Sequence, residues 1–240
     1  MDMTDLKPVK IDIVSDVVCP WCYIGKRRLE TALALVPGVP VEVHWHPFQL
    51  QPDMPREGMA RDAFIKARFG SIEAYAARAK QTAEVAIADG LTYRPDLIKR
   101  QPNTIDAHRL IHWAASDPSG DKAGRVKQRL MELFFAEGGD LSDKDVLARA
   151  AADCGMDADE IRRRLDTDED VALTQARAAR AAEQGVSGVP TYIFADTYAM
   201  SGAQPPEHIA RALQQILAEI NAPSEGEFGK AGKGQAAADE

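Results

Sequence analysis

The chain has 240 residues, of which 45% are hydrophobic and 28% charged, and its formal net charge at pH 7 is −8. This composition is typical of a globular protein with a sizeable buried core. The acidic balance, without any block of consecutive basic residues, argues against a nucleic-acid groove or an anionic membrane surface as the main partner. Small molecules or proteins fit better.

The N-terminal segment does not have the pattern of a secretion signal. Met1 to Pro8 contains two acidic residues and lacks both the basic region and the apolar region that export needs. Every apolar stretch is broken by a charge or a proline before it reaches the roughly 18–20 residues that span a bilayer. We therefore expect a cytoplasmic protein with no membrane partner.

The first fifty residues predict a βαβ unit. Lys10–Val18 is rich in β-branched residues and alternates as a strand does. Cys19 and Pro20 then occupy the N-cap and first helical positions of a helix that Pro37 stops. Val39–Leu50 has the pattern of a second strand, and a βαβ connection implies that the two strands are parallel.

The middle of the chain, from about residue 52 to residue 184, shows helical patterns and no convincing strand. We expect five or six helices there. Four of them are predicted to begin at capping residues, namely Ser71, Asn103, Ser142 and Asp157.

The last folded segment predicts a β-hairpin and a helix. Thr191–Ala195 and Tyr198–Ser201 have strand patterns separated by a short turn, and a helix follows from Pro205. We expect an α/β protein, a thioredoxin-like fold with a large inserted all-helical domain. Residues 8–52 and 185–221 form the thioredoxin-like domain, residues 53–184 the insert, and residues 222–240 a disordered tail.

The pair of cysteines at the start of the first helix indicates redox chemistry. The N-terminus of a helix stabilises a thiolate, which lowers the pKa of Cys19. Cys22 lies one turn further on, within reach of a disulfide, so Cys19 is the predicted nucleophile and Cys22 the resolving thiol. Pro20 fixes the first helical φ, and Trp21 offers a flat apolar surface on which a substrate can lie.

A zinc half-site is the structural alternative for this pair. Four-coordinate zinc needs a second pair of ligands at ordered spacing, and the sequence offers none, so we expect no metal. The third cysteine, Cys154, is expected to be a half-buried free thiol that behaves as a small hydrophobic residue.

Val189 and Pro190 stand directly before the penultimate strand. With the cysteine pair upstream, a cis bond between them aims the backbone of Val189 at the sulfurs, with its N–H and C=O free to bind an extended substrate. An ordinary trans proline at the start of a strand remains the alternative.

Five segments of the chain form a pattern that can be compared with known families, namely Asp16–Lys26, His46–Leu50, Pro102–Arg109, Gly185–Thr191 and Ser201–Gln204. Together they resemble the DsbA-like oxidoreductases, and in particular their cytoplasmic FrnE-type branch. The resemblance implies a thioredoxin fold with an inserted helical domain, a catalytic pair that maps onto Cys19 and Cys22, and a cis-proline that maps onto Pro190.

The chain also resembles glutathione-dependent relatives on this fold, the kappa-class glutathione transferases and the 2-hydroxychromene-2-carboxylate isomerases. Those relatives carry serine where Cys19 stands, so disulfide chemistry is favoured here and a glutathione-dependent transferase or isomerase is the alternative. A non-enzymatic thiol binder is a third hypothesis. Asn103 recurs in the relatives' motif, either as a helix cap or as a substrate-binding residue in the cleft between the domains.

The leading hypothesis is a disulfide reductase, isomerase or oxidase acting on protein or low-molecular-weight thiols and disulfides. We expect no bound cofactor, with glutathione as a candidate co-substrate. No cysteine follows Cys154, so a second dithiol that relays electrons is absent. A reducing cytoplasm favours reductase or isomerase work. The oligomeric state stays open, because Leu133, Phe134 and Phe135 suit either core or interface, with core as the default.

Overall fold

The computed structural model describes residues 6–117 and 121–222. The predicted disordered tail lies, from residue 223 onward, outside the described residues. No helix in the described part of the chain is both long enough and apolar enough to span a membrane.

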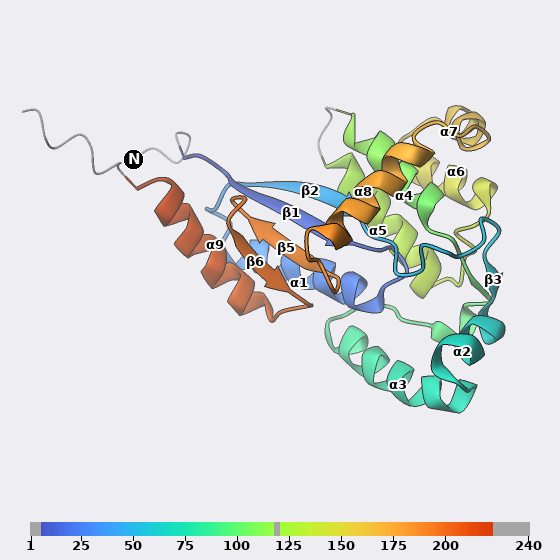
Figure 1. Ribbon diagram of the computed structural model, residues 1–240. Helices are drawn as coiled ribbons and strands as arrows, with labels where there is room; N and C mark the ends of the chain where they lie inside the picture. Colours follow the sequence, from blue (N-terminus) through green and yellow to red (C-terminus); the bar gives the residue numbers. More distant parts are fainter. Residues whose placement is uncertain (1–5, 118–120, 223–240) are drawn as a thin grey trace, which may run out of the picture.

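The main sheet has four strands in the order β2-β1-β5-β6. β1 (Val9–Ser15) is parallel to β2 (Val41–Pro47), and α1 (Pro20–Leu35) joins them, which confirms the predicted βαβ unit. β5 (Thr191–Phe194) is antiparallel to β1 and to β6 (Tyr198–Ser201), which confirms the predicted hairpin. The sheet therefore joins the two ends of the described chain (Figure 1).

One face of the sheet packs against α1 and the last helix, α9 (Pro206–Ile220). The alternation of a strand directs Ile11 and Ile13 toward this face, where they are buried with Leu29 of α1 and Leu213 of α9. The apolar stripes seen in the sequence thus form the core of the sheet domain.

The segment between β2 and β5 is mainly helical, as expected, but it differs from the prediction in two details. It contains seven α-helices within the described residues, rather than five or six. Two strands of two residues each, β3 (Met59–Ala60) and β4 (Arg100–Gln101), form a small antiparallel sheet where no strand was predicted. Two residues are too few to show alternation. The helices are α2 (Arg61–Phe69), α3 (Ile72–Ala88), α4 (Ile105–Ala115), α5 (Lys122–Phe135), α6 (Lys144–Asp153), α7 (Ala158–Leu165) and α8 (Val171–Glu183), with a 3-10 turn at Pro95–Leu97.

The predicted helix starts are partly confirmed. Ser71 and Asp157 are N-caps whose side chains accept hydrogen bonds from backbone N–H groups of the first turn. The prediction for Ser142 was wrong, because Asp143 caps α6 with its carboxylate. Either side chain suits a cap by type, so only the path of the backbone decides between neighbours.

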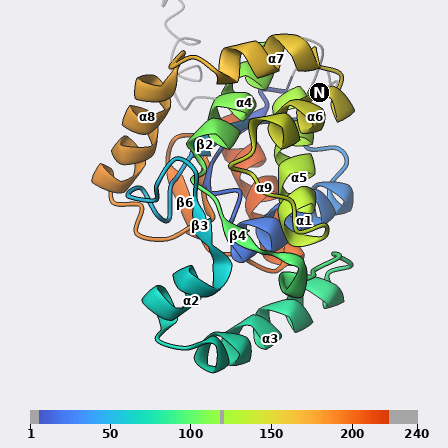
Figure 2. The same cartoon turned by 90° about the vertical axis from the view of Figure 1, so that its right-hand side faces the viewer.

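The inserted helices form two groups around the sheet domain. α4 to α7 lie together, while α2 and α3 lie apart from them at the other end of the insert (Figure 2). The apolar cluster of α4 to α7 continues into the start of α1, where Tyr23 stacks on Phe135 of α5 with ring centroids 5.2 Å apart. Phe134 and Phe135 are core residues, as predicted. The boundaries 53–184 of the insert stay a prediction.

Candidate active site

The two cysteines lie where the sheet domain meets the inserted helices. Cys19 is the N-cap of α1, Pro20 is its first residue, and Cys22 lies in its first turn. Both thiols are free and buried, with exposed fractions of 5% for Cys19 and 2% for Cys22. The Cys22 N–H donates to the Cys19 carbonyl at 3.0 Å, which fixes one helical turn between the two side chains. This is the local geometry predicted from the sequence.

The pKa of the Cys19 thiol is lowered. The main cause is a hydrogen bond from the Cys22 side chain, and the backbone N–H groups of Cys22 and Trp21 add to it. These donors stabilise a negative sulfur at the positive end of α1. Burial and the charge of Asp16 act in the opposite direction without cancelling the effect.

The pKa of the Cys22 thiol is raised well above its ordinary value. Burial is the main cause, and the hydrogen bond that Cys22 donates to Cys19 adds to it. Cys19 therefore ionises before Cys22 as the pH rises. The two sulfurs are therefore chemically distinct, as a nucleophile and a resolving thiol need to be.

The bond between Val189 and Pro190 is cis, in agreement with the prediction. The Cys19 thiol donates to the Val189 carbonyl at a Sγ–O distance of 3.6 Å. This carbonyl is therefore occupied while Cys19 is protonated, whereas the sequence predicted it to be free. No described residue accepts a hydrogen bond from the Val189 N–H.

The other predicted binding residues differ in accessibility. Trp21 is 40% exposed beside the pair. Asn103 is buried, and its side chain is engaged within the protein: Nδ2 donates to the Met54 carbonyl at 2.6 Å, and Oδ1 accepts from the Ile105 N–H at 2.9 Å. Thr104, not Asn103, is the N-cap residue of α4. Asn103 thus ties the loop after β2 to the start of α4.

Asp16 and His108 form a buried polar pair that the sequence did not single out. His108 Nε2 lies 3.3 Å from Asp16 Oδ1 and 3.0 Å from the Phe48 carbonyl oxygen, and the other Asp16 oxygen accepts from the Leu50 N–H at 2.9 Å. Both side chains are almost completely buried. They hold the segment before Cys19, the end of β2 and α4 in one arrangement.

A buried lysine, Lys127 of α5, was also missed. It is 1% exposed, and its ammonium lies 5.2 Å from the centroid of the Trp45 ring. Burial lowers the pKa of Lys127 to about 8, while negative charge at Cys22 and Asp16 acts against this shift. A sequence signal existed, because Lys127 falls between Val126 and Leu130 on the apolar face of the helix.

Gly25 of α1 lets the helix approach the cis-proline. A Cβ atom at Gly25 would lie 2.8 Å from Cγ of Pro190 and 2.5 Å from the hydroxyl of Tyr192. Both distances are too short for a side chain without movement of the neighbours. A glycine inside a helix is unfavourable by roughly 1 kcal/mol relative to alanine, so its presence here has a packing reason.

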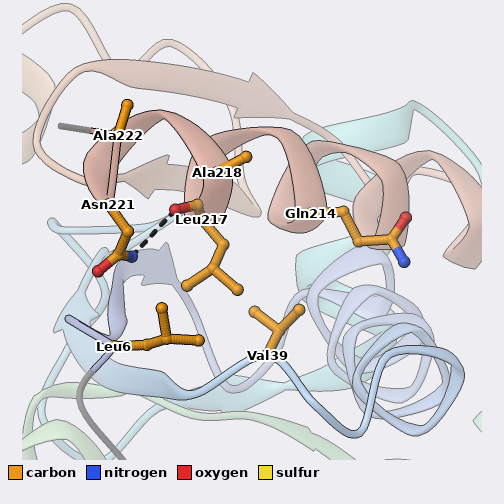
Figure 3. Close-up of a pocket in the computed structure, with 7 residues that line it drawn as sticks. All are labelled: Leu6, Val39, Gln214, Leu217, Ala218, Asn221 and Ala222. Atoms are coloured by element: carbon orange, nitrogen blue, oxygen red, sulfur yellow. Dashed lines mark hydrogen bonds between the residues drawn. The ribbon is translucent and has the colours of Figure 1, made fainter. Parts of the chain in front are cut away.

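Neither cysteine of the pair lines either of the following two hollows among the described residues. An apolar pocket of about 520 Å³ lies beside Leu6, Val39 and Leu217 (Figure 3). The Lys7 N–H donates to Asn221 Oδ1 there, which places the pocket at the start of β1, whereas the cysteines follow its end.

The larger hollow is a groove of about 1170 Å³ between the sheet and the inserted helices. Its walls come from β1, β2, α4, α5 and α8, and they include Trp45, His108 and Lys127. No cluster of three or more potential metal-ligating side chains is present in residues 6–117 and 121–222. The absence of a metal requirement stays a prediction.

Comparisons with known proteins place this arrangement in a family. The family described as DSBA-like thioredoxin domain matches residues 10–214. A probable DsbA oxidoreductase from Streptomyces coelicolor has a crystal structure with 31% sequence identity and a TM-score of 0.78, covering 90% of this chain and 93% of its own. The uncharacterized protein YwbO of Bacillus subtilis (strain 168) is 29% identical over 194 residues, covering 79% of this chain and 88% of its own.

A more distant structure shares the fold. The cytosolic disulfide reductase DsbM from Pseudomonas aeruginosa, solved with GSH, has 17% identity and a TM-score of 0.62. The match covers 86% of this chain and 98% of DsbM.

Proposed function

Because the chain belongs to the DSBA-like thioredoxin domain family, we propose that it is a thiol–disulfide oxidoreductase that works through Cys19 and Cys22. The observation that carries the proposal is that the pKa values of the two thiols at the start of α1 are shifted in opposite directions. The pKa of Cys19 is lowered, and that of Cys22 is raised. In a pair of this kind, one sulfur is a thiolate nucleophile and the other is a protonated resolving thiol.

The proposed reaction is a reversible two-step exchange. The Cys19 thiolate attacks one sulfur of a substrate disulfide, and the substrate S–S bond breaks as the other sulfur leaves as a thiolate and takes a proton. Cys22 then loses its proton and attacks Cys19, which releases the second substrate sulfur. The substrate gains two electrons and two protons to become two thiols, and the Cys19–Cys22 pair becomes a disulfide.

The surface around Cys19 supports the binding of an extended segment or a small thiol. Trp21 is exposed next to the pair, and Pro20 fixes the turn that presents it. When Cys19 is ionised it no longer donates to Val189, whose carbonyl and N–H then both become available to substrate backbone. We assign Pro20, Trp21, Val189 and Pro190 to substrate binding.

Asn103 contributes differently to this site. Its hydrogen bonds to Met54 and Ile105 favour a role in holding the wall of the site over direct contact with the substrate.

We further propose that the protein acts in the cytoplasm, as part of the FrnE-type branch, with low-molecular-weight thiols as its electron source. Glutathione is the first candidate. The fold shared with DsbM, a cytosolic disulfide reductase solved with GSH, supports disulfide reduction with glutathione as the electron source. Glutathione then serves as a co-substrate that reduces the Cys19–Cys22 disulfide after each cycle, without being a bound cofactor.

The test is reduction of insulin by glutathione, followed by precipitation of the B chain. Wild type and Cys154→Ser, which keeps the pair intact, are expected to accelerate it equally. Cys19→Ser is expected to abolish the acceleration, and Cys22→Ser to leave a trapped mixed disulfide on Cys19 that is visible by mass. Full activity in Cys19→Ser would refute the proposal.

A further inference from the structure

Lys127 is a buried charge that the fold does not pair. Among the described residues, no side chain or backbone group forms a hydrogen bond or ion pair with it, and its ammonium faces the Trp45 ring. Burying an ammonium without a partner is unfavourable, and an apolar side chain of the same length would fill the position better. Stability therefore does not explain why a lysine occupies this position.

The groups that act on Lys127 are those of the proposed redox site. Cys22 and Lys26 lie on α1, Cys19 is its N-cap, and Asp16 lies in the segment before it. Each contributes to the electrostatic environment of Lys127. Cys22 has the largest effect among them, after burial itself. Conversely, Lys127 lowers the pKa of Cys22. The packing agrees with this, because Trp45, whose ring the Lys127 ammonium faces, packs against the apolar cluster that contains Cys19 and Cys22.

The remaining charges nearby are already paired. The ammonium of Lys26, 5.9 Å from the same Trp45 ring, binds Glu30. Asp16 is held by His108 of α4 and by the Leu50 N–H. These groups therefore already have hydrogen-bond partners within the fold, whereas the amine of Lys127 has none among the described residues.

Lys127 also lines the groove between the sheet and the inserted helices. Two pairs of polar groups on the other walls are linked to each other: His46 with Asp12 at 2.6 Å, and Arg177 with His112 at 2.9 Å. This hollow is large enough, and polar enough, to hold water beside the amine. Lys127 thus stands between a buried thiol and a route for protons.

We propose that Lys127 is the internal base that takes the proton from Cys22 when Cys22 attacks the mixed disulfide on Cys19. This inference deepens the proposed function and rests on it. The neutral amine accepts the thiol proton and becomes an ammonium, and the Cys22 sulfur forms a bond with Cys19. The bond from Cys19 to the substrate sulfur breaks, and the departing thiolate takes its proton from solvent.

The ammonium then returns its proton through the groove, which restores the amine. In the reverse direction, the ammonium protonates Cys22 as the disulfide opens. The lowered pKa of Lys127, about 8, agrees with this exchange, because both forms of the amine are accessible near neutral pH.

The test separates the two chemical steps with the disulfide reagent 5,5′-dithiobis(2-nitrobenzoate) in a Cys154→Ser background. Cys19 releases one coloured thiolate on attack, and Cys22 releases the second when it resolves the adduct, so stopped-flow absorbance gives two phases. Lys127→Met is expected to leave the first phase within about twofold of the wild-type rate. The second phase is expected to slow by about 100-fold at pH 7, a magnitude typical of a general base.

The pH dependence of the second phase distinguishes a base from a residue with a structural role alone. Only the loss of a base is expected to change its shape. In wild type the second phase is expected to level off above pH 8, whereas in Lys127→Met it is expected to rise in proportion to hydroxide because Cys22 must ionise unaided. Lys122→Met, on the same helix and paired with Asp117, is the matched control and should behave as wild type. An unchanged second phase and pH profile in Lys127→Met would overturn the inference.

A measurement on the wild-type chain covers the case in which Lys127→Met does not fold. The ¹³Cε resonance of Lys127 reports its titration in the reduced and the oxidised protein. The pKa is expected to be lower in the oxidised protein, because the disulfide removes the negative sulfur that favours the ammonium. Equal titration in both states would overturn the inference. If the wild-type protein showed neither coloured phase, the proposed function itself would be refuted.

Discussion

The Cys19 thiol lies 3.6 Å from the carbonyl oxygen of Val189, a residue 170 positions later in the chain. The two residues come from the two segments of the sheet domain, on either side of the helical insert. β1 and β5, which pair directly, bring them together. The site is therefore complete only when both segments have joined one sheet, and a fragment that ends within the insert lacks half of it.

Removing the Cys22 thiol is expected to raise the pKa of Cys19. The hydrogen bond from Cys22 is the main cause of the lowered value, and Cys22→Ala deletes it while the backbone donors remain. The pH dependence of iodoacetamide alkylation at Cys19 measures the change, with Cys154→Ala as the control. A Cys19 pKa that stays the same or falls in Cys22→Ala would contradict this account of the pair.

Removing the charge of Asp16 is expected to lower the pKa of Cys19. The carboxylate opposes a negative sulfur, and Asp16→Asn retains an oxygen that can accept from the Leu50 N–H. Thiolate absorbance near 240 nm, followed against pH, checks the shift. Asp153→Asn, far along the chain on α6, should leave the curve in place. If Asp16→Asn raised the pKa, hydrogen bonding rather than charge would control Cys19.

Gly25→Ala is expected to destabilise the protein by about 1–3 kcal/mol, the usual range for overpacking a core. The added methyl group meets Pro190 and the Tyr192 hydroxyl. Tyr192→Phe in the same chain removes the nearer obstacle and is expected to recover part of the loss. Urea denaturation measures both, and Gly188→Ala, where a Cβ meets nothing within 4 Å, is the control. A neutral Gly25→Ala would show that α1 and the cis-proline are not in close contact.

Lys127→Met is expected to stabilise the fold, and the gain should depend on pH. The pKa of Lys127 is about 8 in the folded chain, against 10.5 ordinarily, so the unfolded state binds more protons between these values. Wild-type stability therefore rises with pH in that window relative to the variant. The gain should be largest below pH 8 and should shrink toward pH 10.5. Urea denaturation at pH 7, 9 and 10 measures it; a gain that is constant or grows with pH would contradict the burial of this charge.

The order of elements and the position of the cysteine pair could be predicted because each leaves a local signal. The alternation of β1 and the proline after Cys19 depend on nearby residues alone. The cis bond before Pro190 was a hypothesis from position, which the structure confirms. The two-residue strands β3 and β4 left no signal, since their pairing depends on chain segments forty residues apart.

The buried polar groups around the pair could not be predicted in the same way. His108 faces Asp16 only because α4 packs at the end of β2, and that packing is tertiary. Lys127 carries a weak signal, as a charge on an apolar helix face, but a lysine there can also reach solvent along its own stem. Which of these occurs depends on Trp45, whose ring covers the ammonium.

The most direct test of the central claim is the redox equilibrium of the Cys19–Cys22 pair. The purified protein is equilibrated in graded glutathione buffers, its thiols are trapped with acid and alkylated, and the disulfide is quantified by mass. We expect one reversible two-electron transition, which Cys154→Ser leaves unchanged and Cys22→Ser abolishes. A pair that stays reduced across the whole range would contradict the dithiol mechanism and favour a glutathione-dependent transferase or isomerase.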